Sequence, residues 1–184
     1  SLHYDSKQEY SIPYVWGTTG IAINRKFVPE QEQSWSLLWN KKYKGKIAIL
    51  DAYDEVIGTG LISSGFSVNA NKVRAFVQAR KKLLEQKKIN TGYFDPTTIR
   101  DNLINEKLWI AQIYSGEAMF AMNKNKNIEF FLPKEGAAIW IDCFVIPKQA
   151  KHKETAELFI NFVLEPKIIK KISKELLYAN AIQD

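Results

Sequence analysis

The stretch KEGAAIWIDCFVIP, Lys134 to Pro147, has one carboxylate near the middle of an apolar run. A buried strand can be almost continuously apolar, and an ionised Asp is seldom found in one without a partner. Because an unpaired buried charge is costly, Asp142 requires water or a cation beside it. The cation can be one of the many Lys side chains or a bound molecule. Trp140, two residues earlier, points to the same face of the strand as Asp142.

More carboxylates and another aromatic ring follow predicted strands. Asp51, Asp54 and Glu55 come after the buried strand KIAIL, and Tyr114 ends the strand LWIAQIY. Ligands of open α/β sheets lie at the carboxyl ends of the strands, so these side chains are expected to lie close to one another. Carboxylates and rings at such a place indicate a site for a cation.

The same residues have a purely structural interpretation, which the spacing leaves open. The three acids after KIAIL can cap a helix and complement its dipole. Tyr114 and Trp140 can be core aromatics, and Asp142 can form a salt bridge with a Lys.

Strands and helices alternate along the chain. Strands are predicted at 14–24, 46–50, 108–114, 127–133 and 137–147, and helices at 34–39, 51–65, 69–88, 95–107, from 115, 153–165 and 166–177. Alternation of this kind predicts an α/β fold with a mainly parallel sheet flanked by helices. Ser34 suits the N-cap of its short helix. The apolar side of the helix at 69–88 comprises Val73, Phe76, Val77, Leu83 and Leu84.

The composition gives little support to other functions. The net charge of +6 comes from Lys spread over helical faces, without the aromatic-basic clusters of a nucleic-acid site. Cys143 is the single cysteine, and His3 and His152 stand far apart among polar residues, so we expect no disulfide, no metal site and no cofactor. The stretch GTGLISSG (58–65) matches a phosphate loop only loosely and lies inside a predicted helix, so we do not expect an enzyme. No apolar run approaches the ~18 residues of a membrane span.

Several stretches in order resemble the spermidine/putrescine-binding proteins of bacterial ABC importers. They are YSIPYVWGTTGIAIN (10–24), SWSLLW (34–39), YKGKIAILD (43–51), IYSGEA (113–118), PKEGAAIWIDCFVIP (133–147) and INFVLEP (160–166). The resemblance implies a type II periplasmic binding protein that captures a polyamine, putrescine or spermidine, between two lobes and delivers it to a membrane permease. In this family carboxylates neutralise ammonium groups and aromatic rings flank the methylene chain, with cation–π contacts of ~0.5–2 kcal/mol.

The resemblance also assigns roles to single residues. Asp142 matches the main amine-binding aspartate, Glu55 matches a second amine-binding carboxylate, and Trp140 matches a ring beside the ligand. Tyr178, in LLYANA, matches a tyrosine that lines the site. Tyr114 stands where many relatives have a ligand-contacting Trp.

One departure from the family pattern bears on specificity. Ala52 stands where the spermidine binders have an Asp, three residues before Glu55. Asp51 or Asp54 can compensate, but neither aligns with that role. A shorter diamine, or a different amine, is therefore an alternative ligand.

The resemblance places two crossings between lobes, near Trp16–Thr18 and near Trp140–Asp142. Residues 18–139 then form a nearly complete second lobe. Residues 1–17 and 140–184 supply the crossing strands and the C-terminal helical part of an incomplete first lobe. On the crossing strand we expect Ile139, Ile141 and Cys143 on the packed face.

Because the chain starts at Ser1 and lacks the family's N-terminal segment, we interpret it as a partial chain. The full-length protein is expected to be a monomer in the periplasm or another extracytoplasmic compartment, with any lipid anchor upstream of Ser1. Two alternatives remain: a binding protein of the same superfamily for another small cation or metabolite, and a fragment without independent binding.

Overall fold

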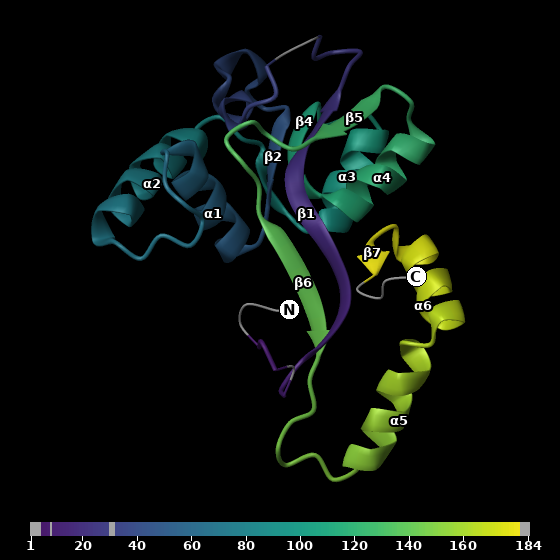
Figure 1. Ribbon diagram of the computed structural model, residues 1–184. Helices are drawn as coiled ribbons and strands as arrows, with labels where there is room; N and C mark the ends of the chain where they lie inside the picture. The colour runs from purple at the N-terminus through teal and green to yellow at the C-terminus, as the bar shows by residue number, and fades with distance from the viewer. Residues whose placement is uncertain (1–4, 8, 30–31, 181–184) are drawn as a thin grey trace. The chain divides into compact units, whose positions relative to one another are not determined.

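The computed structural model describes residues 5–7, 9–29 and 32–180 (Figure 1). His3, one of the two histidines considered above, lies outside the described residues. The chain divides into two compact units. The larger unit is Thr18–Ala138, and the smaller unit is Ser1–Gly17 together with Ile139–Asp184.

A mixed sheet forms the centre of the larger unit. Its strand order is β3 (Gly92–Phe94), β2 (Ile47–Leu50), β4 (Ile110–Tyr114), β1 (Ile12–Asn24), β5 (Ile128–Phe131). Strand β2 pairs in parallel with β3 and β4, whereas β1 pairs antiparallel with β4 and β5. Four strands therefore run in one direction and β1 runs against them, which confirms the predicted α/β class with a mainly parallel sheet.

Helices cover both faces of this sheet (Figure 1). The short 3₁₀ helix η1 (Trp35–Trp39) and helix α1 (Tyr53–Ser63) pack on one face, and α3 (Pro96–Ile104) and α4 (Ser115–Lys124) pack on the other. A second 3₁₀ helix, η2 (Lys41–Tyr43), follows η1. Strand β1 supplies both cores by alternation, because Ile21 and Ile23 face one core and Ala22 faces the other.

Capping side chains fix where two of the helices begin. The hydroxyl of Ser34 accepts a hydrogen bond from the backbone N–H of Ser36 at 3.1 Å, so the predicted N-cap is present, although the element is a 3₁₀ helix. Asp95 caps α3 through the N–H of Thr98 at 3.0 Å, and Pro96 occupies the first turn.

Helix α2 (Val73–Gln86) packs on α1 with a side that coincides only in part with the predicted apolar one. Its buried residues are Ala75, Ala79 and Gln86, whereas Val73 is 79% exposed. Phe76, Val77 and Leu84 are also exposed. Leu83 of the predicted side does lie at the contact, because a Cβ on Gly60 of α1 would be 2.8 Å from Leu83 and 3.3 Å from the Cβ of Ala79. The packed side therefore combines small residues with one large residue, and the missing side chain of Gly60 permits the close approach.

The smaller unit is built on the first part of β1. Strand β7 (Ala179–Asn180) pairs antiparallel with it, and β6 (Ile139–Phe144) also pairs with β1. Helices α5 (Lys153–Val163) and α6 (Pro166–Leu176) follow β6, and Pro166 stands in the first turn of α6. The buried hydrophobic residues are Val15, Ile160, Val163 and Ile169.

The predicted packed face of β6 is wrong for this chain. Ile139 is 68% exposed, Ile141 is 39% exposed and Cys143 is partly exposed. The side chains of the described residues do not cover this face, so its apolar sequence is not matched by burial.

Candidate functional site

Glu55 lies in the first turn of α1, shortly after β2 ends, and Thr19 of β1 holds its carboxylate. The hydroxyl of Thr19 donates a hydrogen bond to Oε1 of Glu55 at 2.9 Å. Thr19 is also the register partner of Tyr114, the last residue of β4. The structure therefore brings Glu55 and Tyr114 to the same residue of β1, at the carboxyl end of β4.

A buried polar side chain beneath this point fixes the start of α1. Gln112 of β4 is 0% exposed, and its amide donates to the backbone carbonyl of Glu55 at 3.1 Å and to the hydroxyl of Thr59 at 2.8 Å. Its oxygen accepts from the backbone N–H of Leu50, the last residue of β2, at 3.3 Å. Both ends of the amide are bonded, so Gln112 links two strands to the first turn of the helix.

The surroundings of Glu55 raise the pKa of its carboxyl above the ordinary value. Burial has the largest effect and disfavours the charged form, and the nearby negative charge of Asp54 acts in the same direction. The hydrogen bond from Thr19 opposes both by stabilising the carboxylate. A cation beside Glu55 would oppose them further.

The other two acids of the cluster remain exposed. Asp51 precedes the helix and Asp54 lies in its first turn, where its charge complements the helix dipole. The N-cap position is Ala52, which has no capping oxygen. Within the described residues neither Asp51 nor Asp54 caps α1 by a side-chain hydrogen bond, so the capping interpretation is not met.

The remaining predicted residues lie in the smaller unit. Trp140 and Asp142 are on β6, and Tyr178 follows α6. The rings of Trp140 and Tyr178 meet edge to face, with centroids 5.0 Å apart and an interplanar angle of 76°. Asp142 is exposed, and no Lys or Arg among the described residues lies within ion-pair distance of it. The salt-bridge interpretation of Asp142 is therefore not met.

The motif residue Glu135 has a structural role. Its carboxylate accepts hydrogen bonds from the hydroxyl of Ser34 at 2.5 Å and from the N–H of Trp35 at 3.2 Å. The indole of Trp35 donates to the carbonyl of Gly136 at 2.7 Å. Burial raises the pKa of Glu135, and these hydrogen bonds, led by that from Ser34, lower it by more. The pKa of Glu135 is therefore below its ordinary value. This part of the PKEG stretch ties the loop before β6 to η1.

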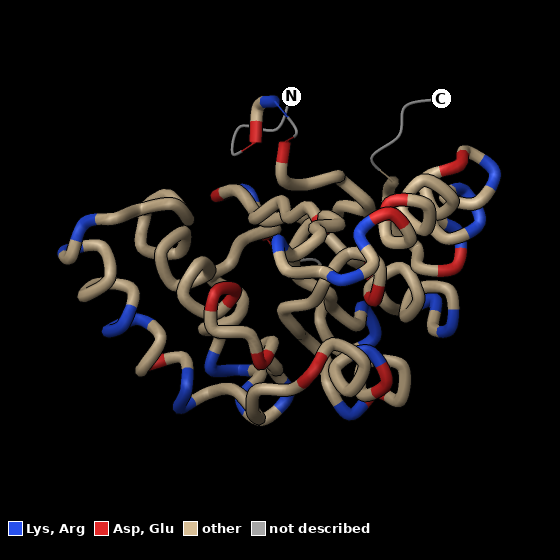
Figure 2. The backbone as a smooth tube through the Cα atoms, turned by 90° about the horizontal axis from the view of Figure 1, so that it is seen from below, with Lys and Arg blue, Asp and Glu red and all other residues tan. Residues whose placement is uncertain are grey.

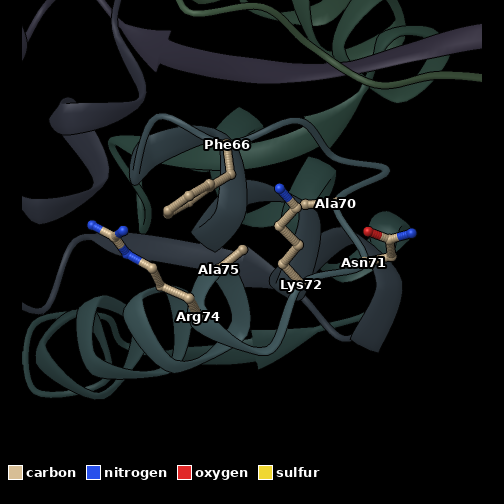
Figure 3. Close-up of a pocket in the computed structure, with 6 residues that line it drawn as sticks. All are labelled: Phe66, Ala70, Asn71, Lys72, Arg74 and Ala75. Carbon is tan, nitrogen blue, oxygen red and sulfur yellow. The ribbon is translucent and has the colours of Figure 1, made fainter.

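A separate hollow of about 400 Å³ lies beside the start of α2. Its lining includes Phe66, Lys72 and Arg74 (Figure 3). The charged ends of Lys72 and Arg74 point to different sides in this view. Lys and Arg residues also recur along α2, which lies on the left of Figure 1 and carries blue segments on the left of Figure 2. Because both charged groups of the lining are positive, the hollow does not suit a cationic ligand.

The described residues include no group of three or more His, Cys, Asp or Glu that can hold a metal ion. In the same part of the chain, no helix has the length and apolar character needed to cross a membrane.

Thr19 and Gln112 were not predicted as parts of the site. Gln112 carries the same signal as Asp142, a polar residue inside the apolar run LWIAQIY. Thr19 has no such signal, because Thr is common in strands and its partner Glu55 is distant in the sequence.

Comparison with known proteins gives the family. The model of the bacterial extracellular solute-binding protein family matches residues 1–183. The spermidine/putrescine-binding periplasmic protein of Escherichia coli K12 is 32% identical over 95% of this chain and 50% of its own length. The putrescine-binding periplasmic protein PotF of the same organism is 31% identical over 97% of this chain and 53% of its own length.

A solved structure agrees with these matches. The spermidine/putrescine ABC transporter substrate-binding protein PotD from Streptococcus pneumoniae is 32% identical, with a TM-score of 0.80 over 96% of this chain and 55% of that chain. The chain thus spans about half the length of the curated relatives it matches, and its fold is that of type II periplasmic binding proteins. It belongs to the bacterial extracellular solute-binding protein family.

Proposed function

We propose that the full-length protein is the solute-binding component of an ABC importer. It captures a polyamine, putrescine or spermidine, between two lobes and delivers it to a membrane permease in an extracytoplasmic compartment. The larger unit corresponds to one lobe and the smaller unit to part of the other. The observation that carries the proposal is the half-buried carboxylate of Glu55, held by Thr19 beside Tyr114, in a chain whose relatives are named for polyamines.

The proposed capture of the amine forms and breaks no covalent bond. Glu55 and Asp142 each take an ammonium group through charge-assisted hydrogen bonds, which are the strong class of such bonds. Tyr114, Trp140 and Tyr178 contact the methylene chain and contribute cation–π attraction. Asp51 and Asp54 add negative charge near Glu55 without direct contact.

Isothermal titration calorimetry of the full-length protein with putrescine and spermidine tests this proposal. We expect saturable binding of the unchanged amine. In Asp142→Asn the free energy of binding should weaken by about 2–5 kcal/mol, because the substitution leaves one ammonium group without its partner. Glu154→Gln, an exposed change in the first turn of α5, is the matched control. Equal affinities in the wild type and Asp142→Asn would remove Asp142 from the site.

Ala52 supports a second candidate, in which the ligand is another small cation or metabolite. A thermal-shift panel of diamines, triamines, thiamine and sugars separates the two: stabilisation by a non-amine alone contradicts the polyamine proposal. Size-exclusion chromatography tests the expected monomer, and titration of the 184-residue chain by itself tests whether it binds independently.

A further inference from the structure

The bulky apolar side of α2 is only partly covered by α1. Its exposed members are Val73, Phe76, Val77 and Leu84. Two of them, Phe76 and Leu84, line a hollow of about 370 Å³ whose walls come from α1, α2 and β3. The other apolar residues of the lining are Ile57, Ala79, Leu83 and Tyr93. Contiguous apolar side chains at a surface, in contrast to single ones, mark interaction sites.

The same helix has an excess of positive charge. From Val73 to Lys88 there is a single acid, Glu85, and the cations are Arg74, Arg80, Lys81, Lys82, Lys87 and Lys88. Among the described residues, no acid lies within ion-pair distance of these cations. Arg80 and Lys87 are exposed and line the hollow itself. The surface is therefore complementary to a partner that is apolar and negatively charged.

Apolar and positive side chains alternate along this surface. Phe76, Arg80, Leu84 and Lys87 follow one another at intervals of four, four and three residues, which places them on one side of α2. An amphipathic helix presents its own side chains at the same spacing and can lay its apolar side into a groove. Carboxylates beside that apolar side would meet Arg80 and Lys87, and a guanidinium can hold a carboxylate through two parallel N–H···O bonds.

Two other occupants fit the surface less well. A bilayer that took up Phe76 and Leu84 would also have to take up Arg80, which lies between them, and a charge in the acyl region is costly. A second copy of this surface, packed face to face, would bring Arg80 and Lys87 against cations of the same kind. A protein helix with acidic residues meets neither difficulty.

We propose that the groove formed by α1, α2 and β3 is a docking surface for an acidic amphipathic helix of a partner protein. Ile57 and Glu55 lie two residues apart on α1, so they point to nearly opposite sides of that helix. Docking in the groove therefore leaves the side of α1 that carries Glu55 free. The inference goes beyond the proposed function and does not depend on the amine-binding role of Glu55.

Fluorescence anisotropy of the full-length protein with two helix-stabilised synthetic peptides tests the proposal. The acidic peptide has Leu at every third or fourth position with Glu between, and the basic peptide has Lys in place of each Glu. At ~0.15 M salt, which screens long-range attraction, we expect saturable binding of the acidic peptide. Its affinity should exceed that of the basic peptide by at least about tenfold.

Two pairs of variants locate the binding on the groove. Leu84→Ser, at a side chain that is 47% exposed, should weaken binding of the acidic peptide by roughly tenfold. Leu132→Ser, which is 48% exposed and lies outside the groove, is the matched control and should have no effect.

The second pair reverses charge. Arg80→Glu combined with Lys87→Glu should make the protein prefer the basic peptide. Lys170→Glu combined with Lys174→Glu, at exposed positions of α6, changes the net charge equally and should keep the preference for the acidic peptide. If Leu84→Ser does not fold, the charge reversal carries the test, because Arg80 and Lys87 are exposed.

The proposal is overturned if the wild type does not prefer the acidic peptide, or if Leu84→Ser and the charge reversal both leave its binding unchanged. Sedimentation with phosphatidylglycerol vesicles and sedimentation velocity of the protein alone examine the other occupants. Binding to vesicles, or a dimer, that is lost in Leu84→Ser while the acidic peptide fails to bind would assign the surface to a membrane or to a second copy.

Discussion

The larger and smaller units bury their apolar side chains to very different extents. The larger unit has two cores, one on each face of its sheet, and Ile21, Ile110 and Leu103 are fully buried in them. In the smaller unit many large apolar residues remain exposed. They are Tyr10, Ile12, Trp16, Ile139, Ile141, Val145, Leu158, Phe159, Phe162 and Leu176.

The candidate site follows the same division. In the larger unit, Glu55 is held by Thr19 and by Gln112 below it, so its geometry is set by hydrogen bonds from two buried side chains. In the smaller unit, Asp142 is exposed on a strand whose neighbouring apolar residues are also exposed. The difference indicates that the geometry around Glu55 is set by residues of the larger unit, whereas Asp142 lies on a strand with exposed apolar neighbours.

The largest effect is expected from truncating apolar side chains in the two units. Ile110→Ala in the larger unit should lower the free energy of unfolding by about 2–5 kcal/mol, because it opens a cavity in a closed core. Leu158→Ala, at a side chain that is 70% exposed, should change it by no more than about 0.5 kcal/mol. Urea unfolding of both variants measures the difference, and similar losses would contradict the distinction.

The next prediction concerns the buried polar link. Gln112→Met keeps the length of the side chain but leaves the N–H of Leu50 and the carbonyl of Glu55 without this partner. We expect a loss of about 1–3 kcal/mol in the free energy of unfolding. Gln78→Met, an exposed change on α2, is the matched control and should have little effect. If both changes have equal effects, the link does not stabilise the larger unit.

The sequence predicted the class of fold and most of the elements, because their apolar runs are long and bounded by polar or turn residues. It did not predict β3 and β7, which are three and two residues long and too short for a periodic signal. The periodicity of α2 identified only part of its packed side: Leu83 lies against Gly60, whereas the fully buried residues include the small Ala75 and Ala79, which the apolar pattern did not indicate.

For the site, the sequence could identify carboxylates and rings but not the contacts between them. The bond from Thr19 to Glu55 joins residues of β1 and α1 that only tertiary folding brings together. The anchoring of Glu135 by Ser34 is a similar case, across most of the larger unit's sequence. Residue type and spacing therefore give candidates, while the partner of each charge has to come from the structure.

A smaller effect on stability is expected from substituting Asp5, which anchors the first described residues of the smaller unit. Its carboxylate accepts hydrogen bonds from the N–H groups of Glu9, Tyr10 and Ser11 and from the hydroxyl of Ser11, at 2.8–3.0 Å. Burial raises the pKa of Asp5, but these bonds together lower it below its ordinary value of 3.8. The stabilisation is therefore present above that value and is lost as the pH falls through the lower folded-state pKa.

Asp5→Asn should thus destabilise the chain at neutral pH, and the difference from the wild type should disappear in strong acid. Thermal unfolding followed over a pH series measures this, with Glu175→Gln, an exposed change on α6, as the control. A difference that persists unchanged in acid would show that the loss comes from geometry and not from the charge of Asp5.

The smallest predicted effect is at Glu55, and it has the opposite sign. The pKa of Glu55 is raised, so the folded chain favours the neutral form of this carboxyl. The resulting stabilisation of the folded chain is present below the ordinary pKa of 4.5 and is lost as the pH rises through the folded-state pKa. Glu55→Gln keeps an acceptor for Thr19 and is neutral at every pH. It should therefore be slightly more stable than the wild type at neutral pH, by about 0.5 kcal/mol or less, and equal to it in acid.

Urea unfolding at neutral pH and in acid measures this difference in stability. The control Glu85→Gln, an exposed change on α2, should have the same stability as the wild type at both. If Glu55→Gln is less stable at neutral pH, the charged bond to Thr19 outweighs the desolvation of the carboxylate. If it is more stable, the larger unit holds a carboxylate at a small cost in stability, which is the result expected from the amine-binding role proposed for Glu55.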